Sequence, residues 1–436
     1  MLGWELPPYN SGGLGVACFQ MAKALAARGD MDIKFVLPYR AKHAEAEKFL
    51  DIIPASDLPP MMDEHGHYLA MGAYAGVCSI CHTRDCEHAR QLGKGLVAAT
   101  KNYAVQVARL ISRQKLRPDI IHVHDWLTME AGVKAKELCR APLIVHVHAT
   151  EWERAGCEHG NPLIWDIEYN GFMMADRIFA VSQHTKDIIV REYGIPADKI
   201  EVIYNALDTD GLTKTTLATD NYLYVKKMKA RGYTVVGANS RLTVMKGLPY
   251  LIEAAALALS RNSKLLFVLI SDGEMRDQLI ELAADLGISD RVIFTGFIRG
   301  QRWREFYELI DIFALPSMVE PFGLTALEAA HYDTAVLLSK TSGVGEVLNN
   351  VMRFDYWDTR KLADEIINIS LSPALSTELR DGVKREYLKV SWDDIAEKMT
   401  REYDKLIARE HEKPRAAANS TENSAKLSRK LEMSYA

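Results

Sequence analysis

The chain has 436 residues, of which 48% are hydrophobic and 25% charged, and its formal net charge at pH 7 is -5. This length is enough for roughly two or three domains that each bury a core, and the composition is that of an ordinary globular protein. The net negative charge gives no general attraction to nucleic acid or anionic membranes, so neither partner is favoured. No apolar run reaches the ~18 residues of a membrane helix, and the first residues do not resemble a signal peptide. We therefore expect a cytoplasmic location.

Short β-branched apolar runs alternate with helical patterns along most of the chain. In the first half the runs begin at residues 33, 120, 143, 177 and 200, and in the second half at residues 234, 264, 291, 311 and 334. This alternation is typical of βαβ units, and nearly continuous apolar strands are typical of parallel sheets covered by helices on both faces. The sequence therefore predicts an α/β protein with two doubly wound sheets.

One polar stretch separates the two series of strands. Residues 206–221, ALDTDGLTKTTLATDN, are polar and carry no strand pattern. Such a stretch between periodic segments is typical of a linker, so we place the domain boundary near Asp208. The prediction is an N-terminal domain of residues 1–207 and a C-terminal domain of residues 208–390.

The sequence predicts one helix followed by a tail in the last part of the chain. From Ser391 the sequence has a capping serine, early acidic residues and apolar positions at helical spacing, which predicts a helix over residues 391–412. Residues 413–436 are small, polar and charged, and this composition predicts a disordered tail.

Three cysteines are crowded into one short stretch. Cys78, Cys81 and Cys86, with His88, supply four soft ligands at close spacing. This set suits tetrahedral zinc, although its spacing matches no standard zinc finger. A reduced surface loop in which the cysteines are incidental explains the same stretch. Both interpretations stay open.

A glycine-rich turn lies near the start of the chain. SGGLG at residues 11–15 opens a helix, so the backbone N–H groups of Gly12 and Gly13 are free to face an anionic oxygen at the positive end of the helix dipole. Ligands of open α/β sheets bind at the carboxyl ends of the strands, where such turns lie. A purely structural glycine turn explains the pattern equally well.

Two cations follow the first strand of the second half. Arg241 and Lys246, in NSRLTVMKG, lie five residues apart around a turn. An arginine fork binds phosphate oxygens bidentately, and a lysine supplies a point charge, so the pair suits a diphosphate. The alternative is two solvated surface cations.

The stretch EPFGLTALE, from Glu320 to Glu328, joins two carboxylates to the start of a helix. Its first N–H groups can hold a phosphate; they belong to Phe322, Gly323, Leu324 and Thr325. Thr325 and Glu328 are three residues apart and share one helix face. A carboxylate accepts hydrogen bonds from both vicinal hydroxyls of a ribose. The two glutamates thus suit two sugars joined by phosphates.

At these residues the sequence resembles the retaining glycosyltransferases of family four, which have the GT-B fold, and their glycogen and starch synthase relatives. Glu320 and Glu328 match the family's two-glutamate motif, E-x7-E, and Arg241 and Lys246 match its diphosphate-binding pair. The resemblance covers about residues 3–410 and includes SGGLG, HVHDW, HATE and YNALD.

The resemblance implies a nucleotide-diphosphate sugar held between two Rossmann-like domains that face each other across a cleft. Transfer would retain the anomeric configuration and need no metal or other cofactor. Glu328 would bind the ribose, Glu320 the donor sugar, and the backbone at Phe322 to Thr325 the sugar and distal phosphate. Arg241 and Lys246 would stabilise the departing diphosphate.

The resemblance also gives roles to the N-terminal domain. His148 would touch the donor sugar and help to position the reacting carbon. Asp125 and Asn205 would lie on the sugar and acceptor side. Two departures from the family stand out: Asn10 and Ser11 replace a lysine that contacts the donor phosphate in the synthases, and Ser271 stands where a glycine is common.

The donor and the acceptor are the least determined features. The glycine, HDW and HATE motifs resemble synthases that extend α-glucans, which implies UDP- or ADP-glucose and a maltodextrin-like glycan acceptor. A lipid or small-sugar acceptor stays open, and the basic stretch from Lys94 allows either a lipid-facing helix or an ordinary sheet-covering helix. A nucleotide-sugar epimerase and a non-catalytic binding module are the rivals from other classes.

Overall fold

The structure is a computed structural model of the chain. It describes all residues except 11, 61–86, 158–159, 211, 213–218 and 413–436, and at residues 87–94 it describes the backbone alone. The predicted zinc ligands Cys78, Cys81 and Cys86 lie outside the described residues, as do the side chain of His88 and the predicted tail.

The first sheet contains six strands that run parallel. They are β1 (Lys34–Leu37), β2 (Asp51–Pro54), β3 (Ile121–His124), β4 (Leu143–Val147), β5 (Arg177–Ala180) and β6 (Ile200–Val202). Strands β3 to β6 lie in chain order, and β1 pairs with β2. Leu2 bridges Val36 of β1 and Val123 of β3, and its N–H donates to the carbonyl of His122 at 2.8 Å. The first residues therefore join the two groups of strands.

The second sheet is also parallel throughout. Its strands are β7 (Thr234–Asn239), β8 (Leu265–Ile270), β9 (Val292–Phe294), β10 (Ile312–Leu315), β11 (Ala335–Ser339) and β12 (Met352–Phe354), in the order β12-β11-β10-β7-β8-β9. The strand order reverses between β7 and β10. Ligands of doubly wound sheets bind at this switch point, beyond the carboxyl ends of the strands. The loops after β7 and β10 are the ones that carry the predicted cations and glutamates.

The ten predicted runs each contain a strand, and the prediction of two parallel sheets is confirmed. Strands β2 and β12 were not predicted. Both are short strands at sheet edges, with the sequences DIIP and MRF.

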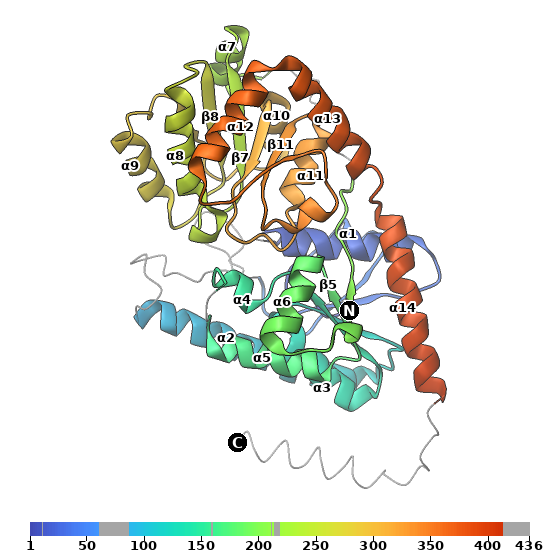
Figure 1. Cartoon of the computed structure of the whole chain (residues 1–436). Helices are drawn as coiled ribbons and strands as arrows, with labels where there is room; N and C mark the ends of the chain where they lie inside the picture. Colours follow the sequence, from blue (N-terminus) through green and yellow to red (C-terminus); the bar gives the residue numbers. More distant parts are fainter. Residues whose placement is uncertain (11, 61–86, 158–159, 211, 213–218, 413–436) are drawn as a thin grey trace, which may run out of the picture.

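Helices cover both faces of each sheet, and the two domains lie one above the other (Figure 1). The helices are α1 (Gly13–Ala27), α2 (Glu87–Gln114), α3 (Trp126–Cys139), α4 (Glu151–Arg154), α5 (Pro162–Met174), α6 (Gln183–Tyr193), α7 (Leu223–Ala230), α8 (Leu248–Leu259), α9 (Arg276–Asp285), α10 (Gly300–Leu309), α11 (Leu324–His331), α12 (Thr359–Leu371), α13 (Pro373–Tyr387) and α14 (Trp392–Glu412). Within the described residues, no helix combines the length and the apolar character needed to cross a membrane.

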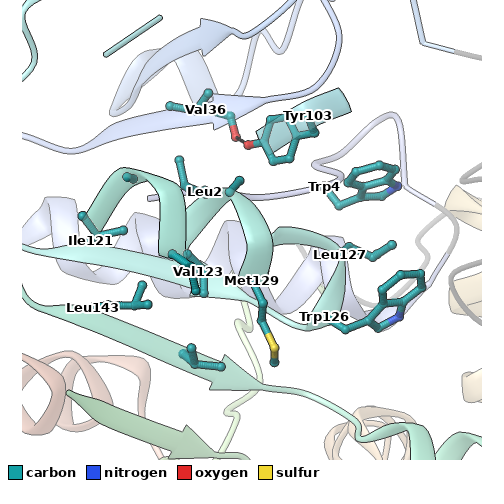
Figure 2. Packing of buried hydrophobic residues seen from close by; sticks show 14 of the residues in the cluster. Leu2, Trp4, Val36, Tyr103, Ile121, Val123, Trp126, Leu127, Met129 and Leu143 are labelled. Carbon is teal, nitrogen blue, oxygen red and sulfur yellow. Dashed lines mark hydrogen bonds between the residues drawn. The ribbon is translucent and has the colours of Figure 1, made fainter. Parts of the chain in front are cut away.

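The core of the N-terminal domain shows how a helix is fixed to the sheet. Tyr103 of α2 is buried, and its hydroxyl donates to the carbonyl of Val36 in β1 at 2.8 Å (Figure 2). Its ring meets Trp4 edge to face, with ring centroids 5.9 Å apart. A buried tyrosine needs such a partner for its hydroxyl, so this contact orients α2 on β1.

Helix α14 returns to the N-terminal domain after the second sheet (Figure 1). Its apolar residues Met399 and Tyr403 are buried in one cluster with Met21 and Leu25 of α1. The helix begins with a serine cap, because Ser391 Oγ accepts from the N–H of Asp394 at 3.1 Å. The chain thus crosses between the domains twice, and Asp208 on the first crossing pairs with Lys23 of α1 at 2.8 Å. The boundary near Asp208 stays a prediction.

Candidate active site

A cavity of about 640 Å³ lies between the two domains. Its size is within the ~300–1,000 Å³ usual for small-molecule sites. The residues predicted for the site line it together, with one exception. They are Gly12, Gly13, His148, Asn205, Arg241, Lys246, Glu320, Phe322, Gly323, Leu324, Thr325 and Glu328.

Lys246 and Glu320 meet directly in the cavity wall. Lys246 Nζ donates to Glu320 Oε2 at 2.7 Å, and the hydroxyl of Ser317 donates to the same oxygen at 3.0 Å. The loops after β7 and β10 are neighbours at the switch point, which brings together two residues 74 positions apart. The cation and the carboxylate therefore act as one coupled pair.

The start of α11 requires glycine at one position. Gly323 caps the helix with φ 109°, a conformation that L side chains rarely adopt. A Cβ there would lie 3.0 Å from Leu315 Cδ2 and 3.2 Å from Glu320 Cγ. This turn lets the first N–H groups of α11 remain free for an anion at the positive end of the helix.

Glu328 is held by a chain of hydrogen bonds from the sheet. The hydroxyl of Tyr307 donates to Glu328 Oε2 at 2.7 Å, and Asn239 Nδ2 donates to the tyrosine oxygen at 2.8 Å. Burial raises the pKa of Glu328 to about 7, and the hydrogen bond from Tyr307 opposes that rise. A fixed, buried carboxylate of this kind can accept hydrogen bonds from two neighbouring hydroxyls.

The glycine-rich turn of the N-terminal domain faces this half of the cavity. A Cβ on Gly12 would lie 3.5 Å from Arg241 Nη2, and one on Gly13 would lie 4.0 Å from Leu324 Cδ1. The turn precedes α1, so the positive ends of α1 and α11 and the side chains of Arg241 and Lys246 all adjoin one space. Two helix N-termini and two cations form a strong binding site for an anion such as a diphosphate.

Asp125 is the exception, since it lies behind the cavity wall. Its side chain is buried, and Oδ1 accepts from the N–H groups of His148 at 2.6 Å and Ala149 at 3.3 Å. In the structure Asp125 fixes the turn that carries His148, because a buried carboxylate is stabilised by backbone donors. Its contact with the donor sugar, which the resemblance implies, stays a prediction.

His148 and Asn205 form the wall on the N-terminal side. Burial lowers the pKa of His148, and the charge of Asp125 opposes that change. Asn205 is buried, and its Oδ1 has no hydrogen-bond partner within the protein. A buried acceptor in a cavity wall is available to a donor group on a ligand.

Two family models match the chain, one in each half. Residues 11–210 match the family described as Glycosyltransferase Family 4, and residues 225–384 match Glycosyl transferases group 1. The chain belongs to the GT-B glycosyltransferases of family four.

Relatives of this glycosyltransferase extend over most of its length. An uncharacterized glycosyltransferase of Methanocaldococcus jannaschii is 27% identical, over 92% of this chain and 97% of the relative. A glycogen synthase of Mycobacterium tuberculosis is 25% identical over 80% of each chain. A D-inositol 3-phosphate glycosyltransferase of Nocardia farcinica is 28% identical, over 78% of this chain and 72% of the relative.

Solved structures share its fold. Sucrose-phosphate synthase from Thermosynechococcus elongatus aligns with a TM-score of 0.70 at 17% identity, over 94% of this chain and 99% of that one. Anabaena HepE in complex with UDP-glucose aligns with a TM-score of 0.67 at 19% identity, over 93% and 99%. The glycosyltransferase therefore has two Rossmann-like domains in the GT-B arrangement.

Some residues of the glycosyltransferase site were not predicted from the sequence. The loop after β9 supplies Phe297 to Gly300 to the cavity wall, and its place after a strand was a usable signal. Tyr307 and Ser317 touch the two glutamates, but neither has a sequence pattern that marks it. Their partners are fixed by packing between elements, which spacing along the chain does not reveal.

Proposed function

We propose that this glycosyltransferase transfers a hexose from a nucleotide-diphosphate sugar to a glycan acceptor, with retention of configuration and without a metal ion. The observation that carries this proposal is the convergence of Arg241, Lys246 and two helix N-termini on one space. Glu320 and Glu328 line the same cavity. Together these groups suit one diphosphate and the sugars joined by it.

The leaving diphosphate is the part of the reaction that needs most stabilisation. Fixed cations and helix amides supply it without reorganisation, and removing one such donor commonly costs on the order of 10²–10³ in rate. Arg241, Lys246 and the amides of α11 are placed for this role, and their combined positive charge does the work for which other enzymes use a metal.

Glu320 is assigned to the donor sugar. Its Oε2 already accepts from Lys246 and Ser317, so the carboxylate is held in one orientation. This favours a positioning role over covalent attack, which would need the carboxylate to move toward the reacting carbon. Since Lys246 also faces the diphosphate, the pair links the sugar to its leaving group.

The names of relatives support glucose as the first donor to test. One relative is a glycogen synthase, and the HepE structure contains UDP-glucose. We therefore propose UDP-glucose, with ADP-glucose as the alternative. A cytoplasmic location stays a prediction from the sequence.

Two arginines besides Arg241 line the cavity and bear on the charge of the acceptor. Among the described lining residues, the arginine and lysine side chains other than Arg241 and Lys246 belong to Arg154 and Arg299. Arg154 is bound by Glu151, Glu168 and the carbonyl of Ala149. Arg299 donates to the carbonyls of Pro8 and Asn10. Arg154 is thus paired with carboxylates, whereas Arg299 keeps its net positive charge, because its carbonyl partners are neutral.

The proposal is tested by incubating the protein with UDP- and ADP-linked hexoses, with and without maltodextrin. Nucleotide release that depends on the acceptor supports a transferase. A new sugar isomer without release indicates an epimerase, and binding without turnover indicates a binding module. The anomeric configuration of the product, read by NMR, tests retention, and activity in EDTA tests independence from metal. A product of inverted configuration would contradict retention. Loss of activity in EDTA that Mg²⁺ restores would contradict independence from metal.

A further inference from the structure

Four histidines lie together inside the N-terminal domain. His122 and His124 belong to β3, and His146 and His148 come from β4 and the residue after it. Alternate residues of a strand point to one face of the sheet, so all four rings share a face. The measured ring centroids lie between 4.6 and 5.7 Å apart.

The geometry does not favour a metal ion held by His146 together with His122 or His148. Ligand atoms of His122, His124 and His146 lie within 4.8 Å of one another, as do those of Cys18, His124 and His148. Tetrahedral zinc with bonds of about 2.0–2.1 Å to nitrogen holds its ligand nitrogens about 3.4 Å apart. The rings of His122 and His146 are stacked with an interplanar angle of 2°, and those of His146 and His148 with 12°. Lone pairs in parallel planes do not converge on one ion.

One hydrogen bond connects the buried cluster to the cavity. His124 Nδ1 lies 3.3 Å from His148 Nε2. His148 lines the cavity, whereas His124 is fully buried. Burial lowers the pKa of both rings, so both are neutral near pH 7. Between two neutral imidazoles, one nitrogen donates and the other accepts.

The direction of this hydrogen bond follows from the other nitrogen of His124. His124 Nε2 is buried and has no hydrogen-bond partner among the described residues. A proton on Nε2 would bury an N–H without an acceptor, whereas a proton on Nδ1 is paired with His148. The proton of His124 is therefore on Nδ1, which donates to Nε2 of His148. The proton of His148 is then on its own Nδ1, the ring nitrogen that does not face His124.

We propose that His124 is a positioning residue that holds His148 as the Nδ1–H tautomer, so that His148 presents a hydrogen-bond donor to a sugar hydroxyl of the donor substrate. This inference rests on the proposed function, because it takes the sugar to lie against His148. It adds His124 to the site as a residue that acts on the ligand only through His148. It also defines which chemical group the ligand meets: an N–H rather than a lone pair.

The first test measures the tautomer of His148 directly in the unsubstituted protein, with one variant used only to assign signals. In protein labelled with ¹⁵N-histidine, NMR distinguishes protonated from unprotonated ring nitrogens, and the His148 signals are assigned by their loss in His148→Asn. We expect protonated Nδ1 and unprotonated Nε2 in His148 near pH 7. The reverse pattern would overturn the proposal, whatever the protein's activity.

The second test uses two variants of similar size. In His124→Asn the side-chain amide lies close to where the Nδ1 of histidine was and keeps a donor, whereas His124→Leu removes it. We expect His124→Leu to let His148 adopt both neutral tautomers and to lower kcat/KM about tenfold, as for one lost hydrogen bond. We expect His124→Asn to keep the Nδ1–H tautomer of His148 and the kcat/KM of the parent protein. Equal effects of the two variants, with the tautomer unchanged, would overturn the proposal.

A third variant controls for packing. His146 stacks on His148 with centroids 4.6 Å apart, yet neither of its ring nitrogens has a hydrogen-bond partner. His146→Leu should leave the His148 tautomer unchanged, and a changed tautomer would show that stacking, not His124, sets it. His148→Ala tests the role of His148 in the proposed function separately from the role of His124. If that variant keeps full activity, the role of His148 in the proposed function fails, while the tautomer measurement still decides the role of His124.

Discussion

Glu328 combines burial with a proposed role, binding of the ribose, that requires charge. Its pKa of about 7 lies above the ordinary value for glutamate because the carboxylate is buried, and only Tyr307 offsets this. A ribose needs the ionised form as a double acceptor. Proton uptake by Glu328 therefore competes with donor binding near neutral pH.

This competition predicts a pH dependence of donor affinity. Above about pH 7 the free carboxylate is ionised, and below it a proton must leave when the ribose binds, so the dissociation constant rises as pH falls, by at most about tenfold per pH unit. Calorimetry with UDP-glucose across this range measures the effect. Glu328→Gln should bind more weakly but with a flatter profile. If the affinity of Glu328→Gln depends on pH as strongly as that of the parent protein, another group causes the effect.

Ser271, where the family commonly has glycine, adopts φ 103°. Such a conformation costs a non-glycine residue about 1–3 kcal/mol, which exceeds the entropic cost of glycine, about 0.5–1 kcal/mol. We predict that Ser271→Gly raises the free energy of unfolding by about 1 kcal/mol, measured by urea denaturation. The matched control is Ser260→Gly, since Ser260 has φ -62° and should lose stability. Destabilisation by both variants would rule out strain at Ser271.

At the scale of elements, the N-terminus of α11 is the feature on which the site depends. It places an anion-binding turn between the two glutamates, and Gly323 is the residue that permits the turn. A side chain there meets Leu315 and Glu320 within 3.2 Å. The constraint therefore acts on both the fold of the turn and the position of Glu320.

Gly323→Ala should consequently impair binding as well as stability. We expect a loss of about 1–3 kcal/mol of stability from backbone strain, and at least a tenfold weaker affinity for UDP-glucose, because the helix amides and Glu320 are displaced. Gly287→Ala is the control: Gly287 has φ 69° but nothing within 4 Å of an added Cβ. It should lose some stability and keep its affinity. Equal affinity in both variants would contradict the role of the α11 turn.

At the scale of the whole molecule, a carboxylate joins the two domains at a helix end. Glu346 of the C-terminal domain accepts from the N–H groups of Gln183 at 2.7 Å and His184 at 2.9 Å, at the start of α6. A negative charge at a helix N-terminus is stabilising by about 0.3–1 kcal/mol. Since this contact forms only when the domains approach each other, it favours the closed cavity.

Glu346→Ala should therefore shift the molecule toward an open form. We expect a KM for the donor about two- to fivefold higher and a larger radius of gyration in solution scattering with UDP-glucose present, with hinges near Asp208 and Trp392. Glu386 is the matched control, because it accepts from Asn349 and Asn350 within one domain. Glu386→Ala should change stability alone. If Glu346→Ala alters neither KM nor the scattering, the contact does not control closure.

Local patterns in the sequence predicted much of the fold and part of the site. Buried parallel strands appear in the sequence as apolar runs, and ten were found. The short edge strands β2 (DIIP) and β12 (MRF) were missed. The glycine turn, the cation pair and the two-glutamate stretch were found because each is short and its chemistry depends on residues close together. The contact of Asp125 with the donor sugar stays a prediction, since spacing does not show which side of a turn a side chain faces.

By itself, the sequence determined the two parallel sheets, the helix that begins at Leu324 and the residue types that suit a sugar nucleotide. These follow from periodicity and capping, which act within a few residues. Only the tertiary structure decided that Lys246 pairs with Glu320, that Tyr307 holds Glu328 and that His124 reaches His148. Those contacts join residues 21 to 74 positions apart, and such distances are set by strand order and helix packing rather than by neighbours along the chain.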